Sequence, residues 1–199
     1  MKRIGEVIAS ATTHFMAQAL RDPDRGLSMP KAPPFGTFVR AHLEDEDLDV
    51  FGLVYHVETT SIDAAHRPLA LNLSRQELRE QQPQIFELLR TDFSLVVTGY
   101  RLDGRVHAGL PPTPPLVHDF VYACDAAEVV ALTERLDFLR TLLTFAQAPT
   151  DELVAACLRG AYRLRGEDRP FLLGAGRALA NLLKNDYDRL NAIMGRLAP

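Results

Sequence analysis

The spacing of apolar residues changes period near residue 115 of this chain, and no single kind of regular element satisfies both periods. Before that point apolar residues mostly alternate with polar ones, as in half-buried strands; after it they recur at intervals of three and four, as in amphipathic helices. The chain has 199 residues, 47% of them apolar, so it can bury a core without disulfides or metal. We therefore predict an α+β protein with β structure first and helices second.

Five segments before residue 110 have the composition of short strands. Strands that follow one another at about 8–12 residues, with glycines among them, are typical of a small closed β-barrel. The glycines fit corners or close approaches of strands, where a side chain would clash. The predicted strands are residues 4–9, 12–20, 35–42, 50–57 and 92–100, and the glycines are Gly5, Gly36 and Gly52.

A helical excursion interrupts this barrel domain, which we assign to residues 1–110. Ser74 and Glu77 have the spacing of a capping box and open a helix, and Pro83 starts a second short helix, so the excursion lies near residues 74–90. Asp103-Gly104 then predicts a tight hairpin.

Residues 111–115 contain four prolines, which favour the stiff, extended polyproline II conformation. The segment is either a PxxP ligand or a rigid linker between domains, and we favour the linker because it falls where the periodicity changes. Residues 116–199 are then predicted to hold one strand near 118–124, followed by a helical bundle.

Four apolar stripes define the helices of this bundle, and we read all of them as core positions. Asp125 and Asp168 are expected to cap helices, and Gly166 is expected to end one. The stripes are Val129, Leu132, Leu136, Leu139 and Leu143; Val154, Cys157, Ala161 and Leu164; Leu172, Ala175, Leu179 and Leu182; and Tyr187, Leu190, Met194 and Leu197.

Known catalytic and cofactor motifs are absent from the sequence. It contains no phosphate-binding loop, no Gly-x-Ser-x-Gly and no His-Glu-x-x-His, and its six histidines are scattered. Asp45, Asp47 and Asp49 alternate like the start of a calcium loop, but Val50 and His56 replace the required Gly and Glu, so we predict a solvated hairpin tip. We expect no cofactor and no metal.

The remaining bulk features indicate a cytoplasmic protein. Cys124 and Cys157 are far apart and belong to no metal-binding motif, which fits two thiols in a reducing compartment. The N-terminus has no signal-peptide pattern, and no apolar run approaches the ~20 residues of a membrane span.

Charge gives a weak indication of an anionic partner. Residues 1–150 hold 14 basic and 20 acidic residues, whereas residues 151–199 hold 8 basic and 6 acidic. Arg159, Arg163 and Arg165 lie close together in the mildly basic part, and the first two share a helix face. Three arginines without stacking aromatics are a small footprint for nucleic acid.

The N-terminal pattern resembles the HAS-barrel, the small β-barrel shared by HerA-type DNA-translocating ATPases and the catalytic subunits of rotary ATP synthases. The resemblance is carried by Ile4-Gly5-Glu6-Val7-Ile8-Ala9, Pro34-Phe35-Gly36-Thr37-Phe38-Val39 and Val50-Phe51-Gly52-Leu53-Val54-Tyr55-His56-Val57, and it covers roughly the first 110 residues. The whole chain is also similar to stand-alone bacterial HAS-barrel proteins known from cyanobacteria. In the ATPases the barrel precedes the ATPase core and forms a ring that serves assembly and docking; this chain has no phosphate-binding loop, so the resemblance implies neither catalysis nor ATP use.

Three functions remain open at this point. The first is a non-enzymatic interaction module that docks on a protein partner, either a HerA-like ATPase or its own copies, through the helical excursion. The second is a nucleic-acid-binding accessory that uses Arg159, Arg163 and Arg165, and the third is an enzyme whose site assembles from distant residues such as His56, Asp63 and His66. The polar residues of the candidate docking helix are Arg75, Glu77, Arg79, Glu80 and Gln81.

Overall fold

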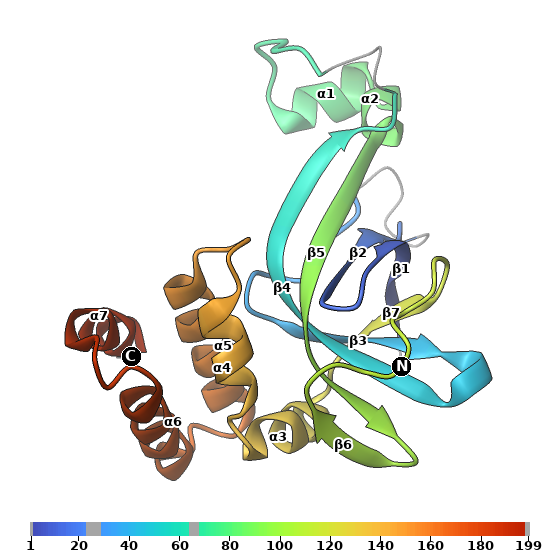
Figure 1. Ribbon diagram of the computed structural model, residues 1–199. Coiled ribbons are helices and arrows are strands. Elements are labelled where there is room, and N and C mark those ends of the chain that lie inside the picture. The colour runs from blue at the N-terminus through green and yellow to red at the C-terminus, as the bar shows by residue number, and fades with distance from the viewer. Residues whose placement is uncertain (1, 23–28, 64–67, 198–199) are drawn as a thin grey trace.

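The computed structural model describes residues 2–22, 29–63 and 68–197, and it confirms the predicted α+β architecture. A β-barrel occupies one side of the molecule and a layer of helices the other, while two long strands project from the barrel and carry two short helices at their end (Figure 1). The barrel comes first in the chain and the helices follow, as the change in periodicity predicted.

Six antiparallel strands close the barrel within the described residues. The sheet order is β2-β1-β7-β3-β4-β5, and a further pairing between β2 and β5 joins the two ends, whereas β6 extends the sheet beyond β5. Closure leaves fewer strand edges open to solvent. The strands are β1 (Arg3–Ser10), β2 (His14–Ala19), β3 (Phe38–Leu43), β4 (Leu48–Ser61), β5 (Leu89–Leu102), β6 (Arg105–Ala108) and β7 (Phe120–Ala123).

The barrel wall carries apolar side chains on both of its faces. Inside the barrel, Phe15, Val50 and Leu95 belong to one buried cluster. Phe51 and Leu53 belong instead to a second cluster, which includes side chains from the helices. Because successive residues of a strand point to opposite faces, the barrel core and the helical core share the same strands.

The helical layer contains five helices among the described residues, where four were predicted. The first predicted helix is split, because Arg135 adopts an extended conformation (φ −106°, ψ 125°) and the next helix begins after Asp137. The helices are α3 (Ala126–Glu134), α4 (Phe138–Thr144), α5 (Thr150–Leu164), α6 (Arg169–Leu182) and α7 (Tyr187–Leu197).

Three stripe residues predicted to be core are exposed instead. Leu164 is 49% exposed, Tyr187 71% and Met194 37%, whereas Ile193 of α7 is fully buried. Leu164 and Tyr187 are the last residue of α5 and the first of α7, and in α7 the buried side lies at Ile193 instead of Met194.

The proline-rich segment 111–115 joins β6 to β7, and β7 lies between β1 and β3. It therefore connects two strands of one sheet rather than the sheet and the helices. The hydrophobic period could not show this, because a single strand of four residues is too short to set a pattern.

β4 and β5 are each 14 residues long and extend beyond the closed part of the barrel. Their far ends lead into α1 (Arg75–Gln81) and α2 (Gln84–Glu87), and the capping box predicted for Ser74 and Glu77 is present at the start of α1. The arm is defined here as the described residues from Tyr55 of β4 to Thr91 of β5, that is 55–63 and 68–91, and it includes α1 and α2 (Figure 1).

Gly36 joins the barrel to the helical layer by a close approach. Its backbone has φ +77°, and a Cβ added there would lie 2.6 Å from the Cβ of Ala156 on α5. Gly36→Ala is expected to lower the free energy of unfolding by about 1–2 kcal/mol through the left-handed backbone and by ~1–3 kcal/mol more through the clash.

Gly104→Ala is the matched control, since Gly104 has φ +74° and open space around the added Cβ. This control should lower the free energy of unfolding only through the left-handed backbone, by about 1–2 kcal/mol. Chemical denaturation of both variants measures the difference, and equal losses would show that the contact with α5 is not tight.

Candidate functional site

The densest group of charged side chains lies at the end of the barrel opposite the arm, where strands meet α3. Oδ1 of Asp49 on β4 accepts a hydrogen bond from Nη1 of Arg40 at 2.6 Å, and Oδ2 accepts one from Nε of Arg101 at 2.8 Å. His42 Nδ1 lies 2.9 Å from the same Oδ1. Oε1 of Glu128 on α3 lies 3.0 Å from both Nε of Arg40 and Nη2 of Arg101.

Asp49 is a correction to the predicted hairpin tip. Asp45 and Asp47 are exposed as expected, but Asp49 is 6% exposed and lies inside strand β4 opposite His42. Three alternating aspartates look alike in the sequence, and the third differs because Arg40, His42 and Arg101 of the neighbouring strands bind it.

The electrostatics of this network indicate a structural role. Two guanidinium groups face two carboxylates, so the four charges balance. Burial would raise the pKa of Asp49, but the hydrogen bond from Arg101 and the charges of Arg40 and Arg101 outweigh it and hold the pKa below its usual value. Glu128 also completes the capping box of α3 with Asp125, so one carboxylate fixes the start of the helix and ties it to the barrel.

A cavity of about 540 Å³ lies beside the network and is lined by Arg3, Arg40, His42, Asp49, Arg101 and Tyr122. Arg3 stacks over the ring of Phe120 at 3.7 Å, and Arg40 lies over the ring of Tyr122 at 4.8 Å. The charged groups that line the cavity are therefore largely engaged with one another and with neighbouring rings.

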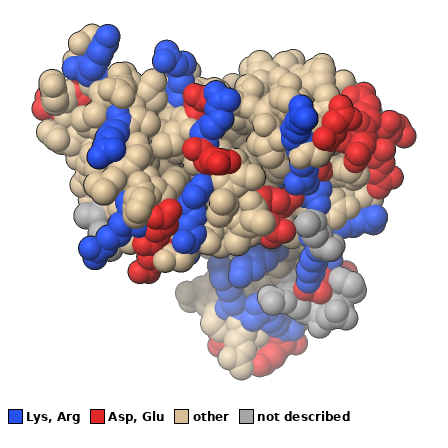
Figure 2. Space-filling model, turned by 90° about the horizontal axis from the view of Figure 1, so that it is seen from below, with Lys and Arg blue, Asp and Glu red and all other residues tan. Residues whose placement is uncertain are grey.

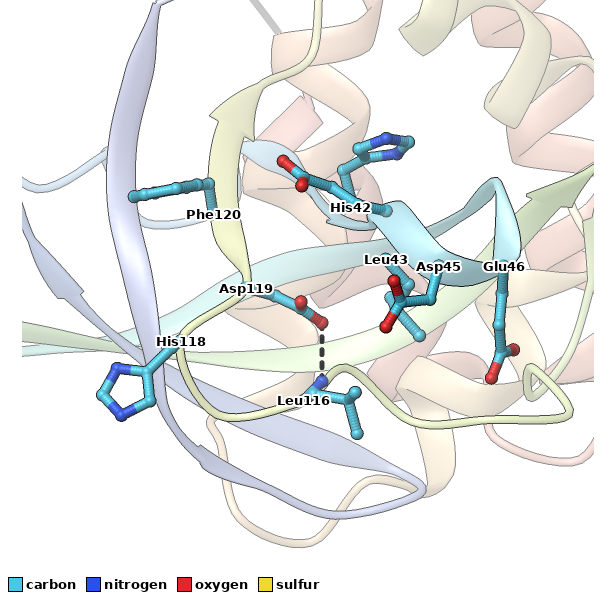
Figure 3. A pocket seen from close by; sticks show the side chains of 9 residues that line it. His42, Leu43, Asp45, Glu46, Leu116, His118, Asp119 and Phe120 are labelled. Carbon is cyan, nitrogen blue, oxygen red and sulfur yellow. Dashed lines mark hydrogen bonds between the residues drawn. The ribbon is translucent and has the colours of Figure 1, made fainter.

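A smaller pocket of about 230 Å³ lies between the β3–β4 tip and the segment before β7. Asp119 accepts a hydrogen bond from the backbone N–H of Leu116 at 2.7 Å, and burial raises the pKa of Asp119. Figure 3 shows that His42 and His118 point away from each other, so the pocket does not bring the two imidazoles together.

Among the described residues, no group of three or more His, Cys, Asp or Glu is placed to hold a metal ion.

The arm has a different character, because it exposes apolar side chains. Of the residues described in α1 and α2, only Phe86 is buried. Arg21 fixes the arm to the barrel by donating hydrogen bonds to the backbone oxygens of Phe86, Glu87 and Leu89 at 2.7–2.9 Å. The exposed apolar residues of the arm are Val57, Ile62, Leu69, Leu71 and Leu88.

The polar residues proposed for docking all lie exposed on α1, but some are engaged within the helix. Glu77 serves the capping box, Arg79 lies over the ring of Phe86 at 5.5 Å, and Glu80 accepts a hydrogen bond from Gln76. Arg75 and Gln81 are exposed at the two ends of the helix. The apolar residues around α1 were missed, because their positions between helix and strand follow no periodic pattern.

Two of the three arginines proposed for nucleic acid are engaged within the helical layer. Arg159 donates to the backbone oxygen of Arg196, Arg165 donates to Thr133 and Val130 of α3, and Arg163 is exposed. On the face seen in Figure 2, acidic side chains gather at one corner, and basic ones are scattered over the main body and grouped on the lobe below it.

The residues named for a hidden enzyme site are described only in part. His56 is exposed on β4, Asp63 is half-buried just beyond that strand, and His66 lies outside the described residues.

No helix among the described residues is a candidate for a membrane span.

The family model described as HAS barrel domain matches residues 4–103. That range includes β1 to β5 and both helices of the arm. No curated protein matches the chain.

Asp49→Asn is expected to lower the free energy of unfolding at pH 7 by about 3 kcal/mol, since it removes a buried carboxylate that contacts both the buried Arg40 and the half-buried Arg101. The native pKa of Asp49 is lowered, so its contribution is present at neutral pH and is lost as the pH falls through that native pKa, below about 4. Thermal or chemical unfolding from pH 7 to pH 3 should show the difference between the two proteins narrowing toward the acid end.

The control is Asp137→Asn, which removes one partner of an exposed pair with Arg135 and should cost about 0.5 kcal/mol or less. A constant difference between Asp49→Asn and the original protein at all pH values would contradict the assigned charge state.

Proposed function

This chain belongs to the HAS-barrel family, and from that membership we propose that it is a non-enzymatic assembly module that docks on a protein partner. In related ATPases this barrel serves assembly and docking, so a HerA-like ATPase is the partner class that we favour, with self-association as the alternative. We place the protein in the cytoplasm, because both cysteines are free thiols.

The observation that carries this proposal is the exposed apolar surface of the arm. Ile62 is 57% exposed, Leu69 80% and Leu88 45%, and all three lie in the segments between the end of β4 and the start of β5. Several exposed apolar side chains on one projecting element are typical of a protein-binding surface. The helical excursion expected to dock is thus supported as the place, through its apolar surroundings more than its polar face.

The charged residues also favour binding over catalysis. The network around Asp49 is neutral and has its charges directed at one another, whereas a catalytic acid or base must be directed at a substrate.

The proposal predicts that changing the arm abolishes partner capture without unfolding the protein. The tagged chain is compared with the triple variant Ile62→Ser, Leu69→Ser and Leu88→Ser in affinity capture followed by mass spectrometry. A captured protein is then purified and its complex measured by sizing with light scattering. The arm variant should lose at least tenfold in affinity, because each exposed apolar side chain at such an interface contributes on the order of 1 kcal/mol.

The matched control carries Leu164→Ser, Leu173→Ser and Met194→Ser, three comparably exposed apolar residues of the helical layer. It should keep full binding. Recovery of the bait alone together with a monomeric sizing profile, or equal loss in both variants, would contradict the proposal.

A further inference from the structure

One edge of β4 is open along the arm. The pairing of β3 with β4 ends at Phe38 and Leu53, and the last contacts on that side are the backbone hydrogen bonds of Val54 with Gly36 (2.8 Å) and Thr37 (3.1 Å). β4 continues to Ser61 and stays paired with β5 on its other side. Residues 55–61 therefore have one paired edge, and no strand of the described chain pairs with the opposite edge.

Beyond the irregularity at Tyr55, this open edge has few of the features that prevent strands from pairing. The register with β5 is unbroken from His56 to Ser61, and residues 56–59 are exposed. The segment contains no proline and no lysine, and Val57, Thr59 and Thr60 are β-branched, which favours strand geometry. A regular edge of unpaired N–H and C=O groups is complementary to one kind of ligand, an extended polypeptide segment.

Charge disfavours the pairing of a second copy of this chain over the whole of residues 55–61. Two copies that pair antiparallel over the whole of residues 55–61 are centred on Glu58, which places the two Glu58 carboxylates directly opposite each other. Like charges in that position are destabilising. A two-fold axis at Val57 instead directs Thr60 of one copy to the position opposite Val54, where Gly36 and Thr37 already bind.

Glu58 also has an acidic neighbour within the sheet. Its cross-strand partner on β5 is Asp92, which is 8% exposed. Oδ2 of Asp92 lies 3.2 Å from Nε of Arg90, and Oδ1 has no hydrogen-bond partner among the described residues. A third strand beside β4 would extend the row Asp92–Glu58 by one side chain, and a basic side chain there would compensate the two carboxylates.

We propose that β4 residues 55–61 bind an extended segment of a partner protein by strand addition, with Lys or Arg of that segment opposite Glu58. This deepens the proposed function, on which it rests for the existence of a partner, and it names the chemistry of the segment that docks. The backbone groups of the open edge bind the partner segment, and Glu58 selects a segment that carries a basic residue.

The test uses synthetic peptides of about seven residues, the length of the open edge, with alternating Thr and Val. One carries Lys at its centre, a second carries Glu there, and a third is the Lys peptide with alternate backbone nitrogens methylated. Binding to the full chain is followed by amide NMR shifts up to millimolar peptide. The Lys peptide should shift and protect amides of residues 55–61 and bind about fivefold more tightly than the Glu peptide, and methylation should abolish binding.

Glu58→Lys should reverse the preference so that the Glu peptide binds more tightly, whereas Glu46→Lys, the same charge change on the exposed β3–β4 tip, should leave it unchanged. Binding that is insensitive to backbone methylation, an unchanged preference in Glu58→Lys, or no shift in these amides would overturn the inference. So would protection of the same amides by self-association at rising protein concentration, since the edge would then serve a second copy. Partner capture that depends on the apolar arm residues but not on Glu58 would leave the proposed function standing and remove only this inference.

Discussion

The need to bury both faces of one sheet determines how this molecule is built. Val50 and Val54 of β4 point into the barrel, while Phe51 and Leu53 of the same strand point outward. A barrel alone would leave those outer side chains in water, at about 1.5–3 kcal/mol for each large side chain. The helices α3 to α5 are therefore a second layer that the strands require, and the barrel and the helices form one continuous structure.

The ionic network follows from the same requirement. Where α3 meets the barrel, the outward positions are Arg40, Asp49 and Arg101 instead of apolar residues, and the helix brings Glu128 to them. Buried charges are tolerated only when each is paired and hydrogen-bonded, which restricts α3 to one position against the sheet. The apolar contacts provide most of the burial, and the network adds a preference for one arrangement.

How much the sequence could show depended on whether the determining contacts were local. Ser74 with Glu77 and Asp103 with Gly104 fix their turns within four residues, and both were predicted correctly. The role of Asp49 depends on Arg101 and Glu128, far along the chain, so a local pattern of alternating aspartates could not reveal it. The same holds for the proposed docking region. The capping box was enough to predict the helical excursion near 74–90, but the open edge of β4 could not be predicted, because an open strand edge has the same composition as a paired one.

The arm is the part of the fold that the two cores do not explain. The pairing of β3 with β4 ends at Leu53 and the helical layer contacts β4 as far as Tyr55, yet the strand continues to Ser61 with its side chains exposed at residues 56–59. Those residues contribute little burial, and the free energy of a compact fold does not require them. A paired extension that is stable because β5 supports it, while its other edge stays open, is rigid before any partner arrives. Binding there would not have to order the edge first, which is the condition under which a short strand can bind a short segment.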